Sequence, residues 1–223
     1  MNLHDIAKEV LEVLGTGRQV EPFSKVYPDF GLKDAYNVTA TVRAGREARG
    51  ERSIGRKIGF TNRTIWAEYG VYAPIWGYVY DHTVQDLTPE GLEVSLSSLA
   101  EPRIEPEIVF GLAAPPAPGM DEQALIRCTD WIAHGFEIVQ SIFPNWSFRA
   151  PDTVAAYGLH GKLFIGPRHS AQSRGRSGLA SFRASRSIFS ATESLSITGP
   201  RPTSSTGLCS RCAISPKRSR KIS

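Results

Sequence analysis

The stretch EPRIEPEIVFGL, residues 101–112, places three glutamates next to an apolar run that predicts a β-strand. Alternate residues of a strand point to the same face, about 6.6 Å apart at ~3.3 Å per residue, so Glu105 and Glu107 should project together. Two like charges side by side are unfavourable unless a cation lies between them. Pro106 cannot donate a ladder hydrogen bond, which predicts an edge or a bulge. The stretch therefore indicates either a cation at the mouth of a sheet or a solvated edge strand whose carboxylates bind Arg103 or nothing.

Outward from this stretch, the patterning predicts an α+β fold built largely on short strands. Apolar residues recur at helical spacing in residues 4–14 (HDIAKEVLEVL) and again in residues 31–51 (GLKDAYNVTATVRAGREARGE), which ends in a basic, glycine-punctuated turn. Further strands are predicted in four segments: 53–62 (SIGRKIGFTN), 74–84 (PIWGYVYDHTV), 91–99 (GLEVSLSSL) and 160–167 (HGKLFIGP). Residues 130–143 (DWIAHGFEIVQSIF) are ambiguous between helix and strand.

Composition limits the class of protein. The 223 residues are 41% hydrophobic and 22% charged, as in ordinary globular proteins, and no apolar run approaches the ~20 residues needed to span a membrane. The start of the chain does not resemble a secretory signal, and three cysteines make no disulfide framework, so we expect a cytoplasmic protein. Three segments are predicted: a helical part at 1–52, a β-rich catalytic core at 53–167, and a tail at 168–223.

Three further residues are candidates for chemistry. Glu137 is flanked by apolar neighbours and is the best third ligand for a hard ion, Mg²⁺ or Mn²⁺, beside Glu105 and Glu107. Lys57 lies in GRKIGFTN among glycines and apolar residues, where it could serve as an acid or base, or simply extend its ammonium to solvent. Asp81 ends a predicted strand, a position typical both of active sites and of turns.

These pieces and their order resemble one group of enzymes. A G-x-K-x-G-x-T segment, then E-x-E about fifty residues on, then E-I-V about thirty residues later, is typical of the 2-keto-4-pentenoate hydratases and 4-oxalocrotonate decarboxylases. This group belongs to the fumarylacetoacetate hydrolase superfamily, and the resemblance covers residues 1–167. It implies the superfamily's mixed β-sandwich-like roll, with the helical N-terminal segment packed against it. Intact relatives are expected to be homo-oligomers.

The resemblance also implies the chemistry. Glu105, Glu107 and Glu137 would bind Mg²⁺ or Mn²⁺, and Lys57 and Asp81 would be the acid/base pair. A small-molecule 2-oxo acid would chelate the ion, which stabilises an enolate while a proton moves, and water would add to the conjugated double bond. A decarboxylase would use the same enolate to expel CO₂, and a C–C bond hydrolase is a further alternative.

Two features depart from the group. Ala156 and Tyr157 stand where many relatives have a polar pair such as Asp-Asn, which leaves hydratase and decarboxylase undecided. His160 is interpreted as a strand-end histidine with no chemical role, with replacement of the lost contact as the alternative. The second departure is the tail, residues 168–223, which carries eleven Lys and Arg, one acid and fifteen serines, a charge of +10 against −6 for the rest.

The tail has two interpretations. Such a composition buries little surface, so we expect it to be disordered. Permitted codons for residues 187–198, read one base earlier, can encode a family-like strand and turn, so our hypothesis is that a frameshift near residue 168 replaced the native ending. The rival is a basic arm for nucleic acid, with Cys209 and Cys212 as half a zinc site, which is a weak signal without a second ligand pair.

Overall fold

The computed structural model describes residues 1–171, 195–198 and 211–216. The chain divides into two compact units, each made of separate stretches of sequence. The first comprises Met1–Val84, Ser95–Ile104 and Glu137–Leu163, and the second comprises Gln85–Val94, Glu105–Phe136 and Phe164–Ser223. The predicted boundaries after residues 52 and 167 stay a prediction.

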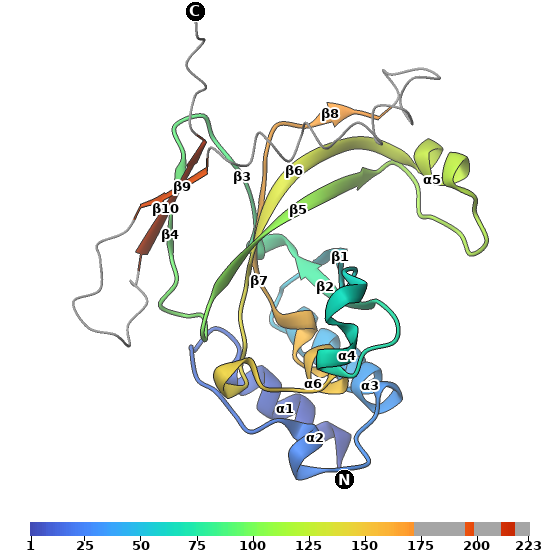
Figure 1. Cartoon of the computed structure of the whole chain (residues 1–223), viewed down its shortest axis with the longest axis vertical. Coiled ribbons are helices and arrows are strands. Elements are labelled where there is room, and N and C mark those ends of the chain that lie inside the picture. Colours follow the sequence, from blue (N-terminus) through green and yellow to red (C-terminus); the bar gives the residue numbers. More distant parts are fainter. Residues whose placement is uncertain (172–194, 199–210, 217–223) are drawn as a thin grey trace, which may run out of the picture. The chain divides into compact units, whose positions relative to one another are not determined.

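The first unit is built around a cluster of helices. The helices are α1 (Leu3–Val13), α2 (Phe23–Val26), α3 (Leu32–Ala48) and α6 (Ala150–Ala155), which lie together in Figure 1. Helix α1 buries Ile6, Val10 and Val13, as the helical spacing predicts, and these residues share one apolar core with Val38 of α3. A buried hydrogen bond from Thr39 Oγ1 to the carbonyl oxygen of residue 154 joins α3 to α6. The two helices predicted near the N-terminus are therefore confirmed.

Helix α3 ends at Ala48 and is followed by Arg49 and Gly50, which agrees with the basic, glycine-punctuated turn that the sequence predicts. Arg46, in the last turn of the helix, is nevertheless only 2% exposed. The Arg46 guanidinium stays in the core because its Nε donates to Glu51 Oε2 at 2.6 Å and its Cζ lies 3.6 Å from the centroid of the Tyr80 ring. A paired arginine can thus occupy a buried helical position that composition alone assigns to a surface turn.

The strands form three sheets among the described residues. The strands are β1 (Ser53–Gly59), β2 (Ile75–Tyr80), β3 (Val84–Asp86), β4 (Leu92–Ser95), β5 (Arg103–Leu112), β6 (Thr129–Val139), β7 (His160–Ile165), β8 (His169–Ser170), β9 (Leu195–Thr198) and β10 (Arg211–Pro216). β1 pairs with β2, the order β4-β10-β9 forms a second sheet, and the order β3-β7-β6-β5 forms the third, with β8 on β6. Short helices connect them: α4 (Trp66–Tyr69) and α5 (Glu122–Cys128), with single 3₁₀ turns η1 (Arg63–Ile65), η2 (Asp81–Thr83), η3 (Pro144–Trp146) and η4 (Tyr157–Leu159).

Strand β5 ends the order of the third sheet among the described strands, so the edge position predicted from Pro106 is confirmed. Figure 1 shows β5 and β6 running side by side as the two longest strands. The ambiguous segment at 130–143 is a strand as far as Val139, because it pairs with neighbours on both sides. The mixed α+β class predicted from the patterning is confirmed.

The tail is described only in part. Residues 168–171, 195–198 and 211–216 are described, and β9 pairs antiparallel with β10. The predictions of disorder and of a frameshift concern mainly residues 172–194, 199–210 and 217–223, which lie outside the described residues. Both predictions stay open.

Candidate active site

A buried glutamate is the centre of the candidate site. Glu137 lies on β6 and is 2% exposed. Its Oε2 atom is 2.9 Å from the ammonium of Lys57, and its Oε1 atom is 2.7 Å from Nδ1 of His160. Lys57 comes from β1, opposite Gly77 of β2, and His160 is the first residue of β7. Three segments far apart in sequence thus converge on one carboxylate.

The protonation states follow from burial and these contacts. Burial alone would raise the pKa of Glu137, but the hydrogen bond from His160 and the charge of Lys57 outweigh it and hold the pKa below its ordinary value. Burial lowers the pKa of His160, although its bond to Glu137 opposes this shift. The pair is therefore an ionised carboxylate and a neutral imidazole at neutral pH, and the imidazole Nδ1–H donates to Glu137.

The other ring nitrogen of His160 also has a partner. Its Nε2 atom lies 2.8 Å from Thr83 Oγ1, and that oxygen lies 2.7 Å from the carbonyl oxygen of Tyr80. The threonine hydroxyl carries a single proton, so it donates to the imidazole or to the carbonyl at any one time. The His160 ring is therefore held at Nδ1 by Glu137, and at Nε2 when the threonine proton points to the ring.

Close backbone approaches surround Lys57. A Cβ atom added at Gly77 would lie 2.6 Å from the carbonyl oxygen of Tyr157, so only glycine allows β2 and this turn to approach so closely. Gly158 has a positive φ of 65°, and a Cβ atom there would lie 3.4 Å from Lys57 Cδ. The turn between α6 and β7 therefore packs directly along the lysine side chain.

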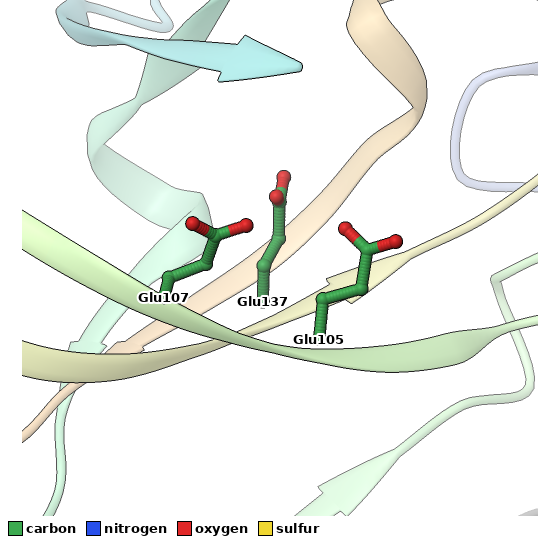
Figure 2. A group of neighbouring side chains, drawn as sticks. All are labelled: Glu105, Glu107 and Glu137. Carbon is green, nitrogen blue, oxygen red and sulfur yellow. The ribbon is translucent and has the colours of Figure 1, made fainter. Parts of the chain in front are cut away.

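Two more carboxylates lie beside Glu137. Figure 2 shows Glu105 and Glu107 on β5 projecting on the same side as Glu137 on the paired strand β6. One oxygen from each of the three side chains lies within 4.8 Å of the others. In six-coordinate Mg²⁺, with oxygens at ~2.1 Å, neighbouring ligand oxygens are about 3 Å apart and opposite ones about 4.2 Å apart. The all-carboxylate donor set therefore suits a hard divalent cation, and the 4.8 Å limit on the oxygen separations is somewhat wider than those of a Mg²⁺ shell.

Asp81 is located elsewhere on the β1–β2 hairpin. Its carboxylate accepts from Arg52 Nε at 3.0 Å and from the backbone N–H of His82 at 2.9 Å. Its backbone N–H donates to the carbonyl of Arg52, five residues from Lys57, which is about 16 Å along a strand. The structure brings Lys57 to Glu137 and does not bring Asp81 to Lys57, so the predicted acid/base pairing stays a prediction.

Sequence reasoning missed two partners of the site. His160 does begin a strand, as predicted, but it also hydrogen-bonds to Glu137. Thr83 lies near the end of the segment at 74–84 that was predicted as a strand, in η2, and contacts the other ring nitrogen of His160. Neither residue belongs to a local motif, and only the departure from the family pattern around residues 156–160 indicated that this turn is unusual.

Comparisons with known proteins identify the class. No family model matches the chain. It is 33% identical over 166 residues to 2-hydroxyhexa-2,4-dienoate hydratase of Comamonas testosteroni, covering 73% of this chain and 62% of that protein. It is 30% identical to 2-hydroxypent-2,4-dienoate hydratase of Pseudomonas putida, covering 74% of this chain and 73% of that protein. The chain therefore belongs to the group of 2-keto-4-pentenoate hydratases and 4-oxalocrotonate decarboxylases.

The solved structures agree with this assignment. The 4-oxalocrotonate decarboxylase from Pseudomonas putida G7, complexed with magnesium and adipate, matches with a TM-score of 0.69 at 25% identity. That match covers 75% of this chain and 64% of that one. A second structure of that decarboxylase is complexed with calcium and acetate and has a TM-score of 0.68.

The chain thus spans about three fifths of the length of several relatives it matches. In the part of the chain that the structure describes, every helix is too short or too polar to cross a bilayer.

Proposed function

We propose that this protein is a metal-dependent hydratase that adds water to a 2-oxo-4-enoate in the catabolism of aromatic compounds. Two hydratases of such acids are relatives at 33% and 30% identity. The observation that carries the proposal is the contact of Lys57 with Glu137, inside a group of three convergent carboxylates. This arrangement supplies a proton carrier next to a cation site, which the reaction requires.

Glu105, Glu107 and Glu137 would hold the cation, Mg²⁺ or Mn²⁺. All-oxygen ligation by carboxylates favours these hard ions over zinc. A bound cation would act as a Lewis acid toward the carboxylate and 2-oxo group of the substrate and would stabilise negative charge on the 2-oxo oxygen. Each oxygen of Glu137 already has one hydrogen-bond or ionic partner, and its remaining lone pair would be available to a cation.

Lys57 is the proposed general acid and base. Its side chain is 12% exposed, so it is shielded from bulk water, and its ammonium is held 2.9 Å from Glu137. From this position Lys57 can move a proton to or from the carbon chain of the substrate before water adds to the conjugated double bond. Asp81 is retained as the second acid/base group, and an Asp81→Asn variant with unchanged turnover would remove it from the proposal.

A decarboxylase is the second candidate, because the matching solved structures are 4-oxalocrotonate decarboxylases and one such enzyme is 35% identical over 130 residues. A C–C bond hydrolase of the same superfamily is the third. Ala156 and Tyr157 stand where many relatives have an Asp-Asn pair, so a polar contact with the substrate would be missing in each of the three enzymes. The products distinguish the three: a hydroxy-oxo acid, CO₂, or two carbon fragments.

The test is a turnover assay on the full chain. We expect 2-hydroxypent-2,4-dienoate to lose its dienol absorbance with Mg²⁺ and not with EDTA, and Glu107→Gln to lower the rate by at least tenfold. Glu12→Gln is the matched control, because Glu12 is a surface glutamate whose nearest ionic partner is Lys8. Turnover that survives both EDTA and Glu107→Gln would refute the metal-dependent mechanism, and CO₂ release from 4-oxalocrotonate would favour the decarboxylase.

The remaining expectations complete the proposal. The β-sandwich-like roll, a homo-oligomeric assembly and a cytoplasmic location would follow from the group's architecture and from the cysteine usage.

The frameshift hypothesis is supported by the composition break at residue 168 and by matches that cover 73–75% of the chain. Sequencing the coding DNA tests it, because a gene without an alternative frame for a family-like ending would exclude the hypothesis. A salt-dependent affinity for DNA or RNA, lost on deleting residues 168–223, would instead favour the basic arm.

A further inference from the structure

His160, the first residue of β7, connects this strand to β6 and η2 beside the candidate metal site. Its side chain is 1% exposed, and each ring nitrogen has one polar partner. Nδ1 lies 2.7 Å from Glu137 Oε1 on β6, and Nε2 lies 2.8 Å from Thr83 Oγ1 in η2. The Thr83 oxygen is itself 2.7 Å from the carbonyl oxygen of Tyr80 at the end of β2. The imidazole is thus a fixed bridge between the hairpin and the glutamate.

The backbone on either side of His160 fixes the position of its ring. Tyr157, Gly158 and Leu159 all have positive φ angles, of 50°, 65° and 61°, which turn the chain sharply before β7. At Gly161 an added Cβ atom would lie only 2.6 Å from the carbonyl oxygen of Ile138, so β7 and β6 are in close contact immediately beside Glu137. The ring therefore has little freedom to move away from the carboxylate.

The two partners of Glu137 differ in how well they can orient it. The Lys57 ammonium is a point charge on a flexible four-carbon stem, so it accepts many carboxylate orientations. The imidazole is planar, has two side-chain torsions, and presents a single N–H at a fixed angle. The bond from His160 therefore determines the rotation of the Glu137 carboxylate about its last torsion and the direction of its remaining lone pairs.

We propose that His160 is a positioning residue that holds the carboxylate of Glu137 in the orientation in which it binds the divalent cation. This inference rests on the proposed function, because it assumes that Glu105, Glu107 and Glu137 bind the ion. Hydrogen bonds from outside the coordination shell that orient a ligand are typically worth 10- to 100-fold in metal affinity. In this role His160 would contact Glu137 and would touch neither the ion nor the substrate.

The chain offers a matched pair of variants. The side-chain amide of asparagine can place an N–H close to the position of imidazole Nδ1, whereas the longer glutamine places its amide near Nε2. His160→Asn therefore keeps a donor toward Glu137 and loses the contact with Thr83, and His160→Gln does the reverse. Both replacements are neutral and polar, so both should lower the stability of the folded protein to a similar extent.

The experiment measures the affinity of the full chain for Mn²⁺ by titration with electron paramagnetic resonance at one fixed pH, without substrate. We expect His160→Asn to bind within about threefold of the wild type, and His160→Gln and His160→Ala to bind about 10- to 100-fold more weakly. Circular dichroism and thermal melting establish that the compared variants are folded. If His160→Gln does not fold, Thr83→Val is compared with His160→Ala instead: it keeps the imidazole donor to Glu137 and loses the contact with Thr83, as His160→Asn does, so binding within about threefold of the wild type is expected.

The outcomes separate the two proposals. Suppose that the wild type binds Mn²⁺. The positioning role is then overturned, and the metal site is kept, if His160→Gln binds as tightly as the wild type or if His160→Asn binds as weakly as His160→Ala. A Thr83→Val variant that binds as weakly as His160→Ala has the same meaning. A wild-type chain that binds no Mn²⁺ overturns the metal site and, with it, the role of His160.

Discussion

Replacing Lys57 with methionine is expected to destabilise the metal-free protein by about 3 kcal/mol. Removing one partner of a buried ion pair typically costs about 3–5 kcal/mol, because the remaining charge is left without compensation in a poorly solvated place. The side chains of Lys57 and Glu137 are 12% and 3% exposed and their charged atoms are 2.9 Å apart, so solvent screens the pair little. The lower end of the range applies because His160 still donates to Glu137.

The assay is urea unfolding in EDTA, followed by tryptophan fluorescence, for the wild type and the variant. A loss of about 3 kcal/mol corresponds to a fall of about 6–12 °C in Tm for a chain of this size. Lys8→Met is the matched control, because Lys8 pairs with Glu12 on the surface of α1 with side chains 69% and 54% exposed. An exposed pair of this kind is worth about 0–1 kcal/mol, so this control should scarcely change the unfolding midpoint.

A double-mutant cycle isolates the interaction. In a Glu137→Gln background the Lys57 ammonium has lost its ionic partner and is itself the uncompensated charge, so Lys57→Met should cost at most about 1 kcal/mol there. The difference, at least about 2 kcal/mol, is the coupling between the two side chains. The reasoning is refuted if Lys57→Met costs as little as Lys8→Met, or if its cost is the same in both backgrounds.

Two further predictions concern the β1–β2 hairpin. Gly77→Ala should destabilise the protein by about 1–3 kcal/mol in the same urea assay, because the new Cβ would lie 2.6 Å from the carbonyl oxygen of Tyr157, whereas Gly55→Ala on β1 meets nothing within 4 Å and should cost far less. Equal costs for the two glycines would contradict this. The hydrogen bond from Arg52 lowers the pKa of Asp81 to about 2 from 3.8, so this carboxylate favours the folded state above pH 3.8 and the benefit disappears as the pH falls through 2. Carboxyl NMR should show the Asp81 titration moving up toward 3.8 in Arg52→Gln, and an unmoved titration would disprove the assignment.

Local patterns predicted much of the fold. The apolar spacing of Ile6, Val10 and Val13 predicts α1 because helical periodicity is a property of neighbouring residues, and the structure buries these residues. The apolar run beside Glu105 and Glu107 likewise predicts β5, with the two glutamates on one face. The segment at 130–143 could not be assigned, because its conformation is decided by the strands that pair with it.

The site was predictable only where a local signal exists. Glu137 stood out as an acid among apolar neighbours, and Lys57 as a lysine among glycines. The contact of His160 with Thr83 joins positions 77 residues apart and has no local pattern. The location of Asp81 depends on strand register, which places it opposite Arg52, and no sequence motif reports register.

The left-handed turn formed by Tyr157, Gly158 and Leu159 has a kinetic consequence for the whole site. For residues other than glycine, this backbone region is disfavoured by about 1–2 kcal/mol each, so the turn is rare in the unfolded chain. It can persist only when β2, β6 and β7 already hold it from both sides. We therefore expect the imidazole to reach its carboxylate among the last events of folding, and hydrogen exchange at the start of β7 to report when the metal ligand becomes fixed.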